Sequence, residues 1–136
     1  MTAYVESSAL LKLYADEPET GAAFALIHEH ETWTTGRHTL VEVRRNLVRM
    51  LANSDLVAAR AAFDVDWRRM VVVELDRVVC DAAARLAETT GIRSLDALHL
   101  GAAEVAGAPD GLPLITFDRR LAQAGRSLGW TVFGAE

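Results

Sequence analysis

Four acidic residues in apolar surroundings are the part of this sequence best suited to chemistry. They are far apart along the chain, and each is embedded in an apolar run: Glu6, Glu42, Asp96 and Asp118. A lone carboxylate in such surroundings is costly unless it is paired or binds a metal ion. Four carboxylates that converge would repel one another unless a cation neutralises them. Because oxygen ligands favour hard divalent ions, the sequence predicts a site for Mg²⁺, with Mn²⁺ as the alternative.

The elements that must position these acids follow from the pattern of apolar residues and from turn and cap signals. Short strands are expected at residues 2–5, 32–34, 70–75, 114–116 and 130–133, the third of them buried. Helices are expected at residues 9–13, 20–28, 39–50, 55–69, 76–90, 94–106 and 119–128. Strands that alternate with helices predict an α/β fold with a mostly parallel sheet of about four to five short strands, covered by helices on both faces.

Three of the acids fall where such a fold binds its ligands. Glu6 and Asp118 come just after predicted strands, and open parallel sheets bind ligands beyond the carboxyl ends of their strands. Asp96 lies in the first turn of a helix, where the helix dipole favours an anion. Each acid also has a purely local interpretation. Asp118 fits a helix N-cap, Asp96 could merely serve a helix N-terminus, Glu6 could be a charge at a strand end, and Glu42 could complete a capping box with Thr39.

The composition indicates one globular domain over residues 1–136. The apolar fraction of 51% excludes disorder, and the apolar runs are far too short to cross a membrane. The first residues do not resemble a secretory signal. The single cysteine, Cys80, excludes an internal disulfide, and we expect it to pack inside a helix layer. These features lead us to expect a cytoplasmic protein.

The charge pattern gives mixed indications about nucleic acid. A net charge of −5 argues against it, because basic patches usually drive such binding. However, Lys12 is the only lysine, and the remaining basic residues are arginines, which make bidentate contacts with phosphate. Five arginines lie beside a candidate site acid: Arg44, Arg45, Arg93, Arg119 and Arg120.

The histidines are interpreted as structural. His99 lies on the apolar side of its helix with Leu95 and Leu98, so we expect a hydrogen-bonded core histidine rather than a metal ligand. The other three lack metal-ligand partners at a useful spacing: His28, His30 and His38.

Taken together, four segments resemble the PIN domain, most closely the VapC toxins of bacterial toxin–antitoxin systems. The segments hold the four acids in the order and spacing of that family, at residues 4–13, 39–45, 91–100 and 115–121. The resemblance implies a three-layer PIN fold and a metal-dependent endoribonuclease. The chain departs from the family at one position, where Glu6 replaces the usual aspartate. The additional methylene could displace the ion, favour Mn²⁺ or slow turnover, or it could be harmless.

The resemblance also implies a role for each site residue. Asp96 and Glu6 are expected to bind the first ion directly and Asp118 to bind it directly or through water, while Glu42 acts through water or orients the nucleophile. The ion would lower the pKa of an attacking water and screen the charge of the phosphate. Two hydroxyl donors and two arginines, which contact phosphate or pair with the acids, are expected to support the site: Ser8, Thr116, Arg93 and Arg119.

Partners are likewise implied by the resemblance. They are a VapB-like antitoxin, an RNA substrate of the tRNA or ribosomal RNA class, and a second copy of the chain in a homodimer. The amphipathic segments at residues 7–14 and 39–56 could form the groove for the antitoxin.

Two alternative functions remain open. Glu6 could mark a weakened PIN fold that acts as an antitoxin- or RNA-binding regulatory module. A metal phosphohydrolase on a similar scaffold is disfavoured, because Lys12 is misplaced for that chemistry.

Overall fold

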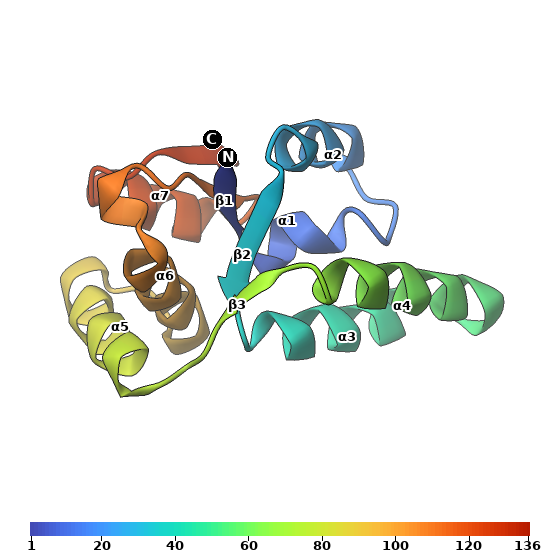
Figure 1. Ribbon diagram of the computed structural model, residues 1–136, viewed down its shortest axis with the longest axis horizontal. Coiled ribbons are helices and arrows are strands. Elements are labelled where there is room, and N and C mark those ends of the chain that lie inside the picture. Colours follow the sequence, from blue (N-terminus) through green and yellow to red (C-terminus); the bar gives the residue numbers. More distant parts are fainter.

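A five-stranded parallel sheet forms the centre of the protein in the computed structural model, which describes residues 1–136 (Figure 1). The strand order is β3-β2-β1-β4-β5, and all four pairings are parallel. The strands are β1 (Thr2–Val5), β2 (Thr32–Gly36), β3 (Val71–Val73), β4 (Leu114–Thr116) and β5 (Val132–Gly134). The predicted α/β fold with a largely parallel sheet is therefore confirmed.

Helices cover the two faces of this sheet in two separate groups. One apolar cluster joins it to α1 (Ser7–Leu11), α2 (Thr20–His28), α3 (Thr39–Met50) and α4 (Asn53–Trp67). A second cluster joins it to α5 (Arg77–Thr90), α6 (Ser94–Ala106) and α7 (Arg119–Ser127). A 3₁₀ turn, η1 (Ala108–Asp110), lies in the expected loop before β4. None of these helices is long and apolar enough to cross a bilayer.

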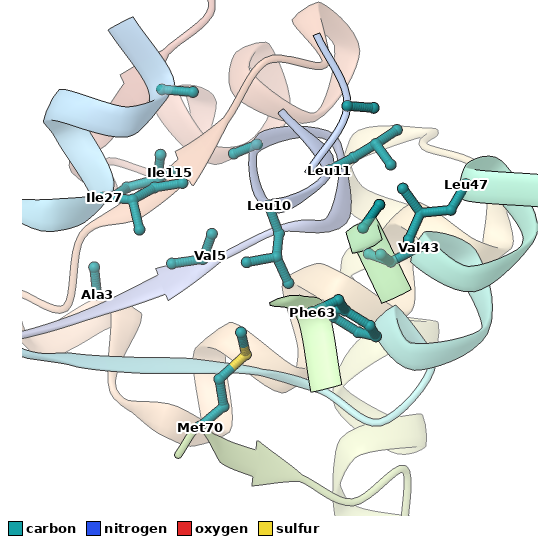
Figure 2. Packing of buried hydrophobic residues seen from close by; sticks show 14 residues of the cluster. Ala3, Val5, Leu10, Leu11, Ile27, Val43, Leu47, Phe63, Met70 and Ile115 are labelled. Atoms are coloured by element: carbon teal, nitrogen blue, oxygen red, sulfur yellow. The ribbon is translucent and has the colours of Figure 1, made fainter. Parts of the chain in front are cut away.

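The central strand β1 contributes side chains to both apolar clusters, because successive side chains of a strand point to opposite faces. Ala3 and Val5 pack in the cluster of α1–α4, together with Leu10 and Phe63 (Figure 2). Tyr4 points the other way and packs in the cluster of α5–α7. All of these side chains are fully buried. The tyrosine hydroxyl therefore has to find its polar partners inside the protein.

All predicted helices and strands are present, with boundaries within two residues of those expected. Two expectations about burial are wrong. The strand around Val71 is an edge strand rather than a buried one, and Val71 is 56% exposed. A short valine run looks the same in a central and an edge strand, so sequence does not separate them. Cys80 is exposed on α5 instead of packed between helices.

Helices α5 and α6 approach each other closely at Gly101. A Cβ atom added to Gly101 would lie 2.7 Å from the carbonyl oxygen of Val79 and 2.9 Å from the backbone nitrogen of Ala83. These are backbone atoms, so no side-chain rotation could relieve the contact. The absence of a side chain at Gly101 thus sets the distance between α5 and α6, and α6 carries Asp96 and His99.

We predict that Gly101→Ala lowers the free energy of unfolding by about 1–3 kcal/mol, as expected for an overpacked core position. Gly21→Ala in α2 is the matched control, because nothing lies within 4 Å of the added Cβ. That variant should be neutral or stabilising by roughly 0.5–1 kcal/mol, since alanine is the better helix former. Urea denaturation followed by circular dichroism measures both. Equal effects would show that the close approach does not limit helix spacing.

Candidate active site

The four acids come from four different elements and meet at the carboxyl end of the sheet. Glu6 directly follows β1 and is the N-cap of α1, while Asp118 follows β4 and is the N-cap of α7. Because β1 and β4 are neighbouring parallel strands, these two residues both lie at the carboxyl end of the sheet. Asp96 lies in the first turn of α6, and Glu42 lies in the first turn of α3.

Glu6 and Glu42 lie close together, because Nε2 of His99 is 3.9 Å from Oε2 of Glu6 and 2.7 Å from Oε1 of Glu42. The ionisation of Asp96 responds to all three of the other acids. Partial burial raises the pKa of its carboxyl from 3.8 to about 6, and the negative charges of Asp118, Glu6 and Glu42 act in the same direction. The charge of His99 opposes this rise. Since repulsion between carboxylates favours the protonated form, the site disfavours a fourth negative charge unless a cation is present. The structure thus brings the four predicted acids together.

Glu6 is held by four hydrogen-bond donors and is only 4% exposed. Its Oε1 accepts hydrogen bonds from the hydroxyl of Thr116 at 2.6 Å and from the hydroxyl of Ser8. Its Oε2 accepts from the hydroxyl of Ser7 at 2.7 Å and from the backbone N–H of Ser8 at 3.0 Å. Each carboxylate oxygen offers about two acceptor positions, so these four donors satisfy the group.

This arrangement corrects the predicted start of α1. The N-cap is Glu6 rather than a serine, and both serines donate to it. The hydroxyls of Ser8 and Thr116 also accept backbone N–H groups of the β4–α7 link, from Phe117 at 2.9 Å and from Asp118 at 3.1 Å. With their acceptor positions used in this way, both hydroxyl protons are directed at Glu6. The network therefore ties the start of α1 to the start of α7.

A second hydrogen-bonded chain holds Glu42. The backbone N–H of Gly36 donates to the Tyr4 hydroxyl at 3.0 Å, and that hydroxyl lies 2.8 Å from Nδ1 of His99. On the other side of the imidazole ring, Nε2 of His99 lies 2.7 Å from Oε1 of Glu42. Because the carboxylate only accepts, the Nε2 proton of His99 faces Glu42. The expected hydrogen-bonded core histidine is present, and its partner is a site acid.

The same chain explains why the predicted capping box at the start of α3 is wrong. The side chain of Glu42 turns toward His99, and the hydroxyl of Thr39 lies 2.7 Å from that of Thr35. Burial opposes ionisation of both partners in the His99–Glu42 pair. Their mutual attraction nevertheless raises the pKa of His99 and lowers the pKa of Glu42. The pair therefore favours a protonated imidazole beside an ionised carboxylate.

His38 is a residue of the site that sequence reasoning missed. Its Nε2 lies 3.9 Å from Oε1 of Glu42, and its ring centre lies 3.9 Å from that of His99. Possible ligand atoms of His38, Glu42 and His99 all lie within 4.8 Å of one another, so His38 does have partners for a metal. Burial and the charge of His99 lower the pKa of His38 to about 4. The sequence feature that could have revealed His38 is its position four residues before Glu42, which places both side chains on the same helix face.

The free carboxylate oxygens fit a hard divalent cation. Asp118 uses Oδ1 to accept the N–H groups of Arg120 and Leu121, and its Oδ2 makes no hydrogen bond. The carboxyl group of Asp96 also makes none, and both acids are only partly buried. Glu6 would have to exchange one of its four donors for a metal ion. Asp96 and Asp118 are thus the residues most ready to bind a cation.

The arginines do not neutralise these acids. Neither Arg93 nor Arg119 forms an ion pair with a site carboxylate, and both side chains are exposed. Arg44 pairs instead with Asp64, at 3.5 Å. The negative charge at the end of the sheet is therefore compensated by hydrogen-bond donors and histidines alone.

Comparison with known proteins places this fold and site in a family. The PIN domain family matches residues 3–127. Ribonuclease VapC35 of Mycobacterium tuberculosis is 33% identical over 132 residues, which cover 95% of this chain and 93% of that protein. The chain belongs to the PIN domain family, and within it to the VapC group.

Solved structures share the fold at lower sequence identity. The sarcin-ricin loop cleaving toxin VapC20 of Mycobacterium tuberculosis superposes with a TM-score of 0.68 at 20% identity, over 92% of this chain and 95% of that one. VapBC2 from Rickettsia felis, bound to a DNA fragment from its promoter, gives a TM-score of 0.67 at 13% identity and covers 100% of both chains.

We predict that Asp96→Asn stabilises the metal-free protein at neutral pH. A carboxyl whose pKa is raised on folding binds more protons in the folded state, so its contribution to stability falls as the pH rises from 3.8 to about 6. An amide removes this penalty, and we expect a gain of about 1 kcal/mol after allowance for solvent screening. Urea denaturation in EDTA at pH 7.5 and pH 4 measures it.

The gain should shrink toward pH 4, where the carboxyl of Asp96 is protonated in the folded parent and partly protonated in its unfolded state. Asp81→Asn on the exposed face of α5 is the matched control, and it should show no such difference between the two pH values. A loss of stability in Asp96→Asn at pH 7.5 would contradict the proposed repulsion among the site carboxylates.

Proposed function

We propose that this protein is a metal-dependent endoribonuclease toxin that hydrolyses phosphodiester bonds in RNA and is neutralised by a VapB-like antitoxin. The observation that carries this proposal is the meeting of four acids at the carboxyl end of the sheet, where Glu6 and Glu42 both lie within 3.9 Å of His99. Partial burial, with the negative charges of the other three acids, raises the pKa of Asp96 to about 6. Such a cluster has a clear use in holding a divalent cation beside a negatively charged substrate. Membership of the VapC group and the name of the relative VapC35, a ribonuclease, support the choice of RNA.

In this proposal Asp96 and Asp118 bind the ion through their free oxygens, and Glu6 joins them by giving up one hydrogen bond. We favour Mg²⁺, with Mn²⁺ as the alternative, because the set contains oxygen donors. When bound, the ion would lower the pKa of an attacking water and offset the phosphate charge. Glu42 would orient that water with Oε2, since Oε1 is held by His99.

The partners extend the same proposal. We infer an RNA substrate of the tRNA or ribosomal RNA class, a homodimer and a cytoplasmic location. For the antitoxin, the outer face of α3 offers a suitable surface. Val41 and Val48 are 67% and 56% exposed there, and they lie in a shallow depression with Arg44, Arg45 and Arg49. An antitoxin segment that combines apolar and acidic side chains would match this surface.

We predict that the antitoxin-free protein cleaves end-labelled total RNA in Mg²⁺ or Mn²⁺ and not in EDTA. Asp96→Asn should lower the cleavage rate at least about 100-fold, because it removes a charged ligand of the ion. Asp81→Asn makes the same chemical change on an exposed surface and should cleave like the parent. Equal rates for Asp96→Asn and the parent would overturn the assignment of the site.

Glu6 provides a second prediction about the same reaction. Glu6→Asp keeps the charge and should cleave within about tenfold of the parent, whereas Glu6→Gln should lose at least about 100-fold because the charge is gone. Glutamine also brings N–H donors toward hydroxyls that already donate at this position. Gel assays of all three proteins in Mg²⁺ and in Mn²⁺ provide the measurement.

The Glu6 variants also test the alternative of a binding module with weakened catalysis. That alternative is favoured by the four hydrogen bonds that occupy Glu6. If a folded parent fails to cleave and Glu6→Asp restores cleavage, the longer side chain is what disables the site. If neither protein cleaves, the ribonuclease proposal is wrong for this chain.

A further inference from the structure

A cavity of about 340 Å³ lies between the α5–α6 link and α7, next to the acidic site. One wall consists of residues 90–93, which lead from the end of α5 into α6. The other wall is one face of α7, with side chains spaced at three- and four-residue intervals: Arg120, Gln123, Ala124 and Ser127. This volume lies in the range of about 300–1,000 Å³ that is usual for pockets that hold a small organic group.

The cavity and the acidic site share the two helices α6 and α7, although no site acid lines the cavity. Arg93 is the N-cap of α6, three residues before Asp96. Arg120 is the second residue of α7, two residues after Asp118. Because α6 and α7 contact each other and Arg93 and Arg120 line the same cavity, the starts of the two helices lie close together. A phosphate held by the two arginines would therefore be near a scissile phosphate held at the acids.

Charge is the property that selects the ligand. Arg93 and Arg120 are exposed, and neither forms an ion pair, unlike Arg37 and Arg85, which pair with Glu74 and Glu104. Guanidinium groups make bidentate, charge-assisted hydrogen bonds with phosphate oxygens. Two free guanidinium groups beside an acidic centre would keep a polyanion in a place where the carboxylates alone would repel it.

The other side chains on the α7 wall suit a nucleotide better than an isolated phosphate. Gln123 is exposed and makes no hydrogen bond within the protein, so its amide can both donate and accept. The hydroxyl of Ser127 donates to the carbonyl of Ala124 at 2.7 Å and remains able to accept. The small side chain of Ala124 leaves room between them. This wall thus offers hydrogen-bonding groups of both kinds to the edge of a base.

We propose that this cavity is a subsite for a nucleotide of single-stranded RNA that flanks the cleaved bond. Arg93 and Arg120 bind its phosphate, and Gln123 contacts its base. The inference rests on the proposed ribonuclease function, and it adds a determinant of substrate affinity and of cleavage-site preference. The residue beside Arg120, Arg119, does not line the cavity and has no part in the subsite.

The first test compares Arg120→Ala, Arg120→Lys and Arg77→Ala in cleavage of a labelled single-stranded RNA dodecamer of mixed sequence. Arg77 is an exposed arginine at the far end of α5, about 20 Å along the helix from the cavity, so its variant controls for net charge. We expect Arg120→Ala to raise KM about tenfold with kcat within about threefold, Arg120→Lys to fall between, and Arg77→Ala to match the parent. Equal KM values for Arg120→Ala and Arg77→Ala would overturn the subsite.

The salt dependence of binding gives an independent measurement. In the Asp96→Asn background, fluorescence anisotropy of the same RNA should show a slope of log K against log salt that is smaller by about 0.7 for Arg120→Ala, as expected for one lost phosphate contact with a single strand. Arg77→Ala should leave the slope unchanged. If the parent does not cleave RNA, the ribonuclease proposal fails. This binding experiment then still decides the subsite, and an unchanged slope for Arg120→Ala would reject it.

Base contact is tested separately through Gln123→Ala. Sequencing of fragment ends from total RNA should show a changed base preference at one position beside the cut for this variant. Arg120→Ala should cut more slowly at the same preferred positions, because phosphate contacts carry no sequence information. An unaltered preference in Gln123→Ala would contradict the assignment of that residue.

Discussion

Repulsion among carboxylates is the constraint on which the rest of this site depends. Four acids meet at the end of a parallel sheet, and three of them are compensated by fixed donors. Glu6 has four hydrogen-bond donors, Glu42 has His99, and Asp118 caps α7. Asp96 has no such partner, and the pKa of its carboxyl rises to about 6. Preorganised donors thus hold most of the charge, while burial and the remaining repulsion disfavour the ionised form of Asp96, which a cation in the proposed site would relieve.

The donors also connect the two helix layers across the end of the sheet. Tyr4, from the central strand, accepts the N–H of Gly36 and reaches His99 in α6, and His99 in turn holds Glu42 in α3. Since α3 and α6 pack on opposite faces, this chain fixes one layer relative to the other. A Cβ at Gly36 would lie 2.7 Å from the His38 ring and 3.1 Å from the Tyr4 hydroxyl, so only glycine fits.

The glutamate at position 6 is accommodated by its surroundings. Its longer side chain folds back over the start of α1, where it meets the N–H and hydroxyl of Ser8 and the hydroxyls of Ser7 and Thr116. The additional methylene therefore lets the carboxylate reach these local hydrogen-bond donors, and a metal ion would compete with them for its oxygens.

The sequence by itself determined the parallel α/β fold and the four acids, because apolar periodicity, helix caps and strand ends are local patterns. It did not determine that β3 lies at the edge, that His99 holds Glu42, or that the rings of His38 and His99 meet. Each of those facts depends on which strands become neighbours and on how α3 and α6 pack at the end of the sheet. Only the tertiary structure decides such contacts, since they join residues far apart in the chain through packing that no local pattern records.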